Sequence, residues 1–127
     1  MTWEDYRAKL IIATMGEAES CSFFEKFLIA CVGWNRWLYQ KKYKFNSIEQ
    51  DFLGYRREIK INEVSRLAME DSIKVVDRAF VELNANKNSE YSKIFFFNLS
   101  GHKPSTIFDV EEVKFENTQH HFFKIID

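Results

Sequence analysis

The residues best suited to acid–base chemistry near neutral pH are three histidines, His102, His120 and His121. His102 follows a glycine in a predicted turn, whereas His120 and His121 stand directly before the last apolar run of the sequence. Neighbouring residues of a strand point to opposite faces, so His120 and His121 are not expected to bind one metal ion together. No cysteine or second spaced histidine lies near them in the sequence, which argues against zinc. We therefore predict structural or surface roles for this pair, with no metal and no cofactor.

The chain offers no recognisable nucleophile motif, and its clustered acidic residues allow three interpretations. Cys31 falls on the apolar side of a predicted helix, where a thiol is inert packing, and no nucleophile motif surrounds Cys21 or Cys31. The acidic residues near the end of the sequence are Asp109, Glu111, Glu112 and Glu116. Paired carboxylates can act in hydrolysis or bind a divalent cation. Solvent-facing strand positions explain them with fewer assumptions, and an acidic patch for a basic partner is a third interpretation.

Basic residues alternate with aromatic ones between Trp37 and Phe45, and again at Tyr55–Arg57. Aromatic faces stack on nucleobases while cations hold phosphates, so such a segment can bind single-stranded nucleic acid. The other interpretation is a helix end at which lysines offset the macrodipole and aromatic rings pack. The residues that would contact RNA in the first interpretation are Asn35, Lys41, Lys42, Arg56 and Arg57.

The element that must position these residues is a strongly apolar segment, Phe23–Tyr39, whose apolar side chains cover more than half of a helical wheel. A helix this apolar has to be surrounded by other elements, so we predict that it is the buried centre of the domain. Asn35 falls between Trp34 and Trp37 inside the apolar arc, and a buried amide there needs hydrogen-bond partners. The charged residues on the opposite side of the wheel are Glu25, Lys26 and Arg36.

Three capping boxes divide the first two thirds of the chain into helices. They are formed by Thr2 with Asp5, Ser22 with Glu25, and Ser47 with Gln50. We expect helices over residues 3–16, 23–39, 48–55 and 63–83. Beyond residue 90 the pattern changes to short aromatic and β-branched runs, which predict strands near residues 91–98, 113–115 and 121–126. A helix over residues 91–99 is the alternative for the first of these runs.

The expected fold class is α+β, in which about four N-terminal helices pack around a buried central helix and a small C-terminal antiparallel sheet or hairpin follows. Residues 1–127 form a single domain, helical over 1–83 and strand-rich over 90–127. The net charge of −1 argues against a strong nonspecific attraction to nucleic acid. The sequence carries no predicted membrane span or signal peptide, so a cytoplasmic protein without membrane contact is expected.

Two stretches resemble HEPN-type helical proteins, a superfamily of RNases and nucleic-acid-associated modules. Phe24–Tyr39 resembles their aromatic-rich core helix, and Asn98–Lys103 resembles the Arg-Asn-x-Leu-x-His-Gly-x-Lys stretch of their active sites. The resemblance implies that His102 is the proton-transfer histidine and Asn98 its polar neighbour. The family's catalytic arginine would fall near Phe96, so the resemblance implies a helical, often dimeric module that has lost its RNase activity.

The sequence thus favours a small binding or regulatory protein that acts through protein–protein contacts, such as an inhibitor, immunity or antitoxin-type protein. Its aromatic residues exceed what one core is expected to hide, and aromatic side chains anchor many interfaces. The predicted interface residues are Phe95, Phe97, Phe122 and Phe123. A homodimer, an RNA partner in a HEPN-like defence or toxin–antitoxin module, and a subunit of a larger assembly are the alternatives.

Overall fold

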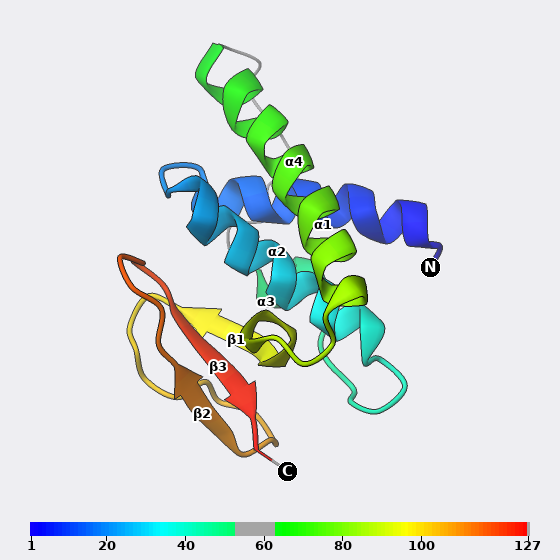
Figure 1. Ribbon diagram of the computed structural model, residues 1–127, viewed down its shortest axis with the longest axis vertical. Helices are drawn as coiled ribbons and strands as arrows, with labels where there is room; N and C mark the ends of the chain where they lie inside the picture. Colours follow the sequence, from blue (N-terminus) through cyan, green and yellow to red (C-terminus); the bar gives the residue numbers. More distant parts are fainter. Residues whose placement is uncertain (53–62, 127) are drawn as a thin grey trace.

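The computed structural model describes residues 1–52 and 63–126, in which a layer of helices is followed by a small sheet (Figure 1). The helices are α1 (Trp3–Ala18), α2 (Phe23–Leu38), α3 (Ile48–Asp51) and α4 (Glu63–Ala85). A 3-10 turn, η1 (Glu90–Lys93), leads into the strands β1 (Ile94–Asn98), β2 (Val110–Val113) and β3 (His121–Ile125). The predicted α+β fold class is confirmed. None of the described helices is both long and apolar enough to cross a bilayer.

The predicted helices are found with small differences at their ends. Helix α1 continues past Gly16 to Ala18, and α4 continues two residues beyond Leu83. Helix α3 ends at Asp51 because Phe52 adopts an extended conformation, and the predicted continuation to Tyr55 lies outside the described residues. The run predicted as a strand from Tyr91 begins as a 3-10 turn and becomes a strand at Ile94.

Helix α2 is the centre of the fold and contacts α1, α4 and β1. Every residue from Glu25 to Arg36 is buried, which the wheel predicts for the apolar residues of this stretch but not for the charged ones. Helix α1 crosses close to α2 at Gly33, where an added Cβ would lie 2.2 Å from a methyl carbon of Leu10. Trp34 lies between α1 and α4, and its indole nitrogen donates a hydrogen bond of 2.7 Å to the Val76 carbonyl. The tryptophan-flanked helix is therefore interior scaffold.

The three charged residues on the remaining side of α2 are buried as well, each beside a partner from another element. Lys26 lies 3.5 Å from a carboxylate oxygen of Asp71 in α4. Glu25 pairs with His120, and Arg36 pairs with Asp51. Because each of the three groups has an ion-pair or hydrogen-bond partner, α2 can be enclosed on every side without an isolated polar group among them.

The sheet has the strand order β1-β3-β2, and both pairings are antiparallel. Phe122 belongs to the core between β3 and the helices, whereas Phe123 belongs to a second apolar cluster on the other side of the strand. Aromatic rings from the two long connections, Tyr43, Phe45 and Phe108, pack against this second cluster. Apolar side chains therefore cover both faces of β3.

This two-sided packing overturns the predicted phenylalanine interface. Phe95, Phe122 and Phe123 are buried, and Phe97 is half-buried against Phe52. Phe122 and Phe123 alternate between the two faces of β3, and a register shift of β1 at Phe95 places Phe95 and Phe97 in different clusters as well. The helices cover one face and the connections cover the other. The aromatic surplus of the sequence therefore fills two apolar clusters instead of forming an exposed patch.

Helix α1 is tied to α4 by a paired Arg7 and Asp77, which allows a prediction about pH. The Arg7 guanidinium donates two hydrogen bonds to the Asp77 carboxylate, at 2.7 and 2.8 Å, and these lower the pKa of Asp77 below its ordinary 3.8. A depressed pKa stabilises the folded state above the unfolded value and loses that effect as the pH falls through the folded value. Both side chains are partly exposed, so the contribution at pH 7 is expected to be below about 1 kcal/mol. Urea unfolding of the protein and its Arg7→Gln variant should differ at pH 7 and converge as the pH falls well below 3.8.

Candidate binding cleft

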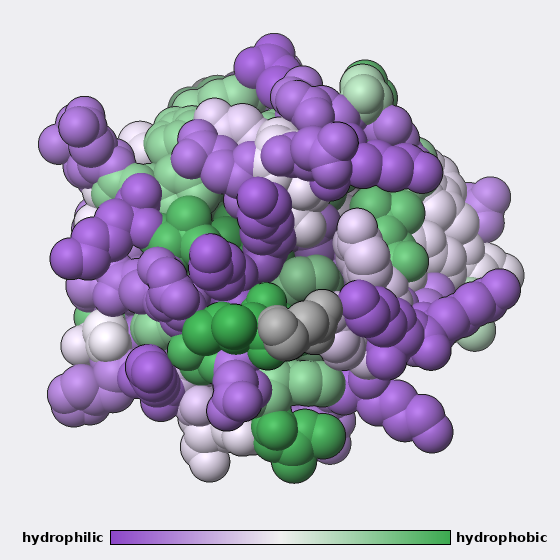
Figure 2. Space-filling view, turned by 60° about the horizontal axis from the view of Figure 1, so that its bottom comes forward, coloured by the Kyte–Doolittle hydropathy of each residue, from purple (hydrophilic) through white to green (hydrophobic). Residues whose placement is uncertain are grey.

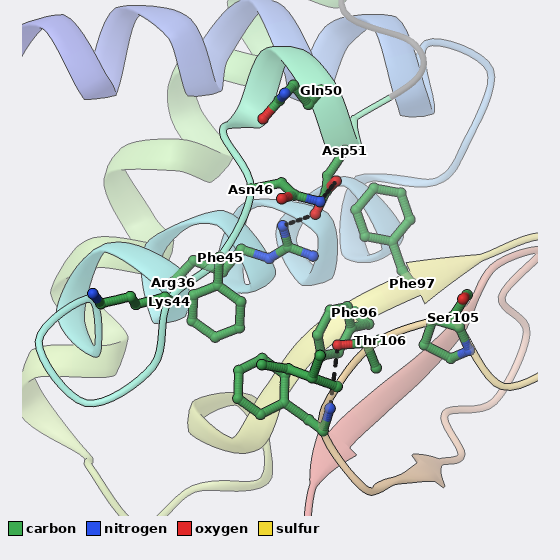
Figure 3. Close-up of a pocket in the computed structure, with 13 residues that line it drawn as sticks. Arg36, Lys44, Phe45, Asn46, Gln50, Asp51, Phe96, Phe97, Ser105 and Thr106 are labelled. Atoms are coloured by element: carbon green, nitrogen blue, oxygen red, sulfur yellow. Dashed lines mark hydrogen bonds and ion pairs between the residues drawn. The ribbon is translucent and has the colours of Figure 1, made fainter.

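A cleft of about 790 Å³ opens between the α2–α3 connection and the β1–β2 connection (Figure 3). The first connection contributes Lys44–Asn46, and the second contributes Pro104–Phe108. Phe96 of β1 and Arg36 of α2 also line the cleft. β1 and β2 are both antiparallel to β3 and so run in the same direction, which requires the long β1–β2 connection to return along the length of the sheet.

Arg36 is the fixed polar group of this cleft. Its side chain donates a hydrogen bond of 2.8 Å to the Phe95 carbonyl and one of 2.6 Å to Asp51 Oδ2. The guanidinium carbon lies 5.1 Å from the ring centre of Phe45 and 4.9 Å from that of Phe96, close enough for cation–π attraction. Arg36 is 6% exposed, so its charge is held within the wall of the cleft.

The rim combines one very exposed apolar side chain with polar groups. Ile107 is 92% exposed, the largest value among the exposed large apolar residues described. Exposed polar side chains beside it in the lining are Lys44, Asn46, Gln50 and Ser105. An apolar anchor with a polar rim is the composition found in protein-recognition surfaces.

The polar side chains of the α3 wall are held in place by local hydrogen bonds. Asn46 Nδ2 donates a hydrogen bond of 3.0 Å to Asp51 Oδ1, and Gln50 Oε1 accepts one of 3.1 Å from the Ser47 N–H. The Ser47–Gln50 pair is the predicted helix cap, so the cap that begins α3 also shapes one wall of the cleft (Figure 3). The wall is therefore organised before any partner arrives.

A second hollow, of about 400 Å³, is basic. Its lining includes the lysines Lys42, Lys93 and Lys124 and the tyrosines Tyr39 and Tyr43. Glu111 also lines it, so the positive charge there is partly compensated. The face that comes forward in Figure 2 shows apolar areas separated by hydrophilic side chains.

Among the described residues, Asn35 lies apart from Asn98 and His102, the pair implied by the HEPN resemblance. Asn35 is fully buried, and its amide nitrogen donates to the carbonyls of Tyr91 and Ile94 at 2.7 and 2.8 Å. Asn98 ends β1, and its side chain holds the turn that follows by accepting a hydrogen bond from Gly101 N–H and donating one to the His102 carbonyl. Asn35 thus anchors β1 to α2, and its predicted role in contacting RNA is wrong.

The remaining predicted residues are placed as follows. Lys41 and Lys42 are exposed after the end of α2, and Arg56 and Arg57 lie outside the described residues. The acidic residues Asp109, Glu111 and Glu116 are exposed, and half-buried Glu112 lies 3.0 Å from the Nδ1 of His121. His120 is buried, and its partners are described below.

Sequence reasoning missed Arg36 and Ile107 as site residues. The signal for Arg36 was an arginine on the most enclosed helix of the chain, because a buried guanidinium requires partners. Ile107 gave a weaker signal, an aliphatic residue directly after a polar turn. No family model matches the chain, no curated protein matches it, and no solved structure matches it.

Proposed function

We propose that this chain is a binding protein that recognises a protein partner through the cleft between the α2–α3 and β1–β2 connections. It would act by occupying its partner, in the manner of inhibitor, immunity or antitoxin-type proteins. The observation that supports this most is Ile107, 92% exposed at the rim of a cleft whose walls are aromatic. Exposing a large aliphatic side chain at a built cleft costs solvation free energy, and a partner that covers it recovers that cost.

The chemistry of the cleft favours a loop or extended segment of the partner. Phe45 and Phe96 offer apolar surface for a side chain, while the exposed amides of Asn46 and Gln50 can bond a peptide backbone. The guanidinium of Arg36 already has a carboxylate partner, so it contributes a fixed wall and no unsatisfied charge. Lys44 adds one exposed cation at the rim, which suits a partner segment with an acidic residue.

Site-specific photo-cross-linking in the native host tests this proposal. A photoreactive amino acid placed at Ile107 should give one discrete protein adduct. The same residue placed at Val81, which is 67% exposed on α4, should not give that adduct. Adducts at both positions, or at neither, would contradict the cleft as the recognition surface.

The Ile107→Asp variant should bind the cross-linked partner about 10–100-fold more weakly, because an apolar anchor becomes a charge that must be desolvated. The Val81→Asp variant should bind as the unaltered protein does. Isothermal titration with the purified partner measures both affinities. An equal loss in both variants would point to a general loss of folding, which circular dichroism would reveal.

The basic hollow supports a second candidate, a HEPN-like RNA-binding module. Lysines with neighbouring tyrosines suit the phosphates and bases of single-stranded RNA. Labelled RNA should then bind with an affinity that falls as salt rises, and Lys93→Glu should weaken binding more than Lys74→Glu on α4 does. An RNase assay comparing the protein with His102→Ala tests residual cleavage. If the protein neither binds nor cleaves RNA, this candidate is excluded. The sedimentation coefficient of the protein would show whether it is a dimer.

A further inference from the structure

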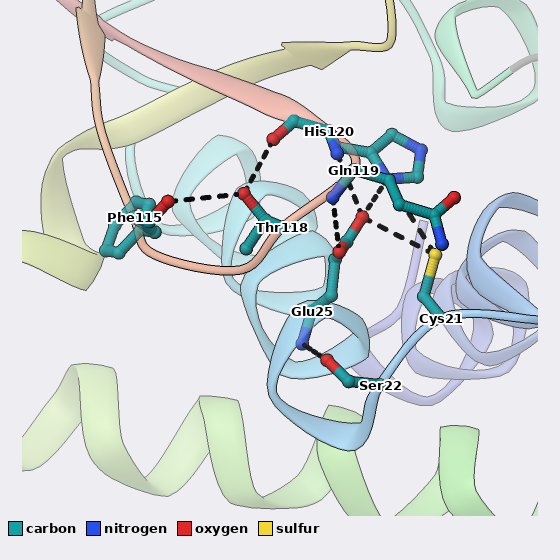
Figure 4. A network of polar contacts seen from close by, with 7 residues as sticks. All are labelled: Cys21, Ser22, Glu25, Phe115, Thr118, Gln119 and His120. Atoms are coloured by element: carbon teal, nitrogen blue, oxygen red, sulfur yellow. Dashed lines mark hydrogen bonds and ion pairs between the residues drawn. The ribbon is translucent and has the colours of Figure 1, made fainter.

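Three potential metal ligands from distant parts of the sequence converge beside the first turn of α2 (Figure 4). Cys21 lies in the turn between α1 and α2, Glu25 lies in the first turn of α2, and His120 directly precedes β3. The Cys21 Sγ is 3.4 Å from Glu25 Oε2 and 4.0 Å from His120 Nδ1. Glu25 Oε2 and His120 Nδ1 are hydrogen-bonded to each other.

The backbone holds these groups in place. Both oxygens of Glu25 accept backbone hydrogen bonds from the loop before β3, Oε1 from Gln119 at 2.8 Å and Oε2 from His120 at 3.0 Å. Thr118 Oγ1 donates a hydrogen bond of 3.0 Å to the His120 carbonyl, and this bond holds the loop from within. Metal sites depend on such supporting bonds, because they orient the ligands before the ion binds.

The cluster is closed on the protein side and open at the sulfur. Glu25 is 1% exposed and His120 is 4% exposed, whereas Cys21 is partly exposed. An ion could therefore enter past Cys21 and retain one position for solvent. Three protein ligands with one open position is a common arrangement for zinc.

We propose that Cys21, Glu25 and His120 bind a single zinc ion through Sγ, a carboxylate oxygen and Nδ1. Zinc bonds of about 2.0–2.3 Å in a tetrahedron separate ligand atoms by roughly 3.3–3.8 Å. The distances from Cys21 Sγ to its two neighbours, 3.4 and 4.0 Å, match that spacing within a few tenths of an ångström. The Glu25 and His120 atoms lie closer because they are hydrogen-bonded to each other, and the ion would take the place of that hydrogen bond.

The mix of donors favours zinc over the other common ions. Thiolate and imidazole together are poor ligands for magnesium and calcium, which prefer oxygen. Burial, followed by the charge of Glu25, raises the pKa of the Cys21 thiol to about 11. The thiol therefore stays protonated in the absence of an ion and is not a reactive nucleophile, whereas bound zinc would displace its proton.

The competing explanation is a purely structural Glu25–His120 pair that fastens β3 to α2. That role needs no sulfur, so Cys21 separates the two explanations. The chain also contains a matched control for each ligand tested: Cys31 is a buried cysteine outside the cluster, and His121 is the neighbouring histidine paired with Glu112.

Cobalt(II) titration of the chelator-treated protein tests the proposal, because a cobalt–thiolate bond gives a charge-transfer absorption in the near ultraviolet. We expect this band to saturate at one cobalt per chain and to disappear when zinc is added. Cys21→Ala should abolish the band, and Cys31→Ala should retain it. His120→Asn should weaken cobalt binding by at least ~10–100-fold, the loss typical of disturbed ligand shells, whereas His121→Asn should not.

Thermal unfolding gives a second measurement that does not depend on the band. Zinc should raise the melting temperature of the protein and of the Cys31→Ala and His121→Asn variants, but not that of Cys21→Ser. Absence of both the band and the temperature shift in the folded, unaltered protein would overturn the proposal. Persistence of the band in Cys21→Ala, or its loss in His121→Asn with His120→Asn unaffected, would overturn it equally.

Discussion

Replacing Arg36 with alanine is expected to lower the free energy of unfolding by about 3–5 kcal/mol, because it removes a buried charged side chain together with its ion pair to the partly buried Asp51. The guanidinium is the hydrogen-bond donor for both Asp51 and the Phe95 carbonyl. Without it, the partly buried Asp51 carboxylate loses its countercharge, and the rings of Phe45 and Phe96 face a void. Helix α3 and one wall of the cleft would loosen together.

Urea unfolding followed by circular dichroism measures this loss. Arg78→Ala is the matched control, because Arg78 is exposed on α4 and contacts only the face of Phe23 among its described ring and ion-pair partners. We expect the control to change stability by no more than about 0.5 kcal/mol. Arg36→Met fills the space but donates no hydrogen bond, so its loss of stability should lie between those of Arg36→Ala and Arg78→Ala. A loss below about 1 kcal/mol for Arg36→Ala would show that the pair contributes little to the fold.

Replacing Glu25 with alanine should have a similarly large effect, about 3–5 kcal/mol, for a related reason. Its carboxylate accepts hydrogen bonds from two backbone N–H groups, of Gln119 and His120, and contacts the His120 imidazole and the Cys21 thiol. Burial raises the pKa of Glu25, but the bonds from His120 and Gln119 outweigh it and hold the pKa below its usual value. The group is therefore charged in the folded protein, and removing it leaves several buried donors without an acceptor.

The Glu25→Ala measurement should be made with a chelator present, so that metal binding makes no contribution. Glu116→Ala, at an exposed position of the β2–β3 connection, is the control and should unfold as the unaltered protein does. Glu25→Gln retains one acceptor oxygen but turns an amide donor toward other donors, so it should lose part of the stability. Equal stability of Glu25→Ala and the control would contradict the role assigned to this carboxylate.

Local signals were sufficient to predict most of the elements. The caps at Thr2 and Ser22 accept hydrogen bonds from Asp5 and Glu25 N–H, as their spacing predicts. Such bonds span three residues, so the sequence contains all the information that they require. The apolar wheel of α2 is equally local, and it predicted the central helix.

The prediction failed where a side chain finds its partner far along the chain. The capping box predicts that the Glu25 side chain accepts a hydrogen bond from the backbone of Ser22. Its carboxylate instead accepts hydrogen bonds from residues almost a hundred positions away. The same separation hid the cluster, because Cys21 and His120 are neighbours only after the sheet has packed on α2. The absence of a cysteine near His120 in the sequence was therefore no guide to its surroundings.

The predicted phenylalanine interface was wrong for a different reason. Alternation along β1 indicates that its side chains point to two faces, but it does not reveal whether one face or both are covered. Coverage of the second face depends on Tyr43, Phe45 and Phe108 in connections whose paths no local pattern predicts. The candidate binding surface therefore lies at the two connections and not on the strands, where the sequence had placed it.

The strand order has a consequence for biosynthesis. β3 is the last of the three strands to leave the ribosome, yet it occupies the middle of the sheet and gives β1 and β2 their common neighbour. β1 and β2 therefore remain unpaired until β3 has been synthesised and pairs with both. The neighbouring helices α1 and α2 can pack before β3 is made, whereas closing the sheet is a late event that depends on contacts of long sequence separation.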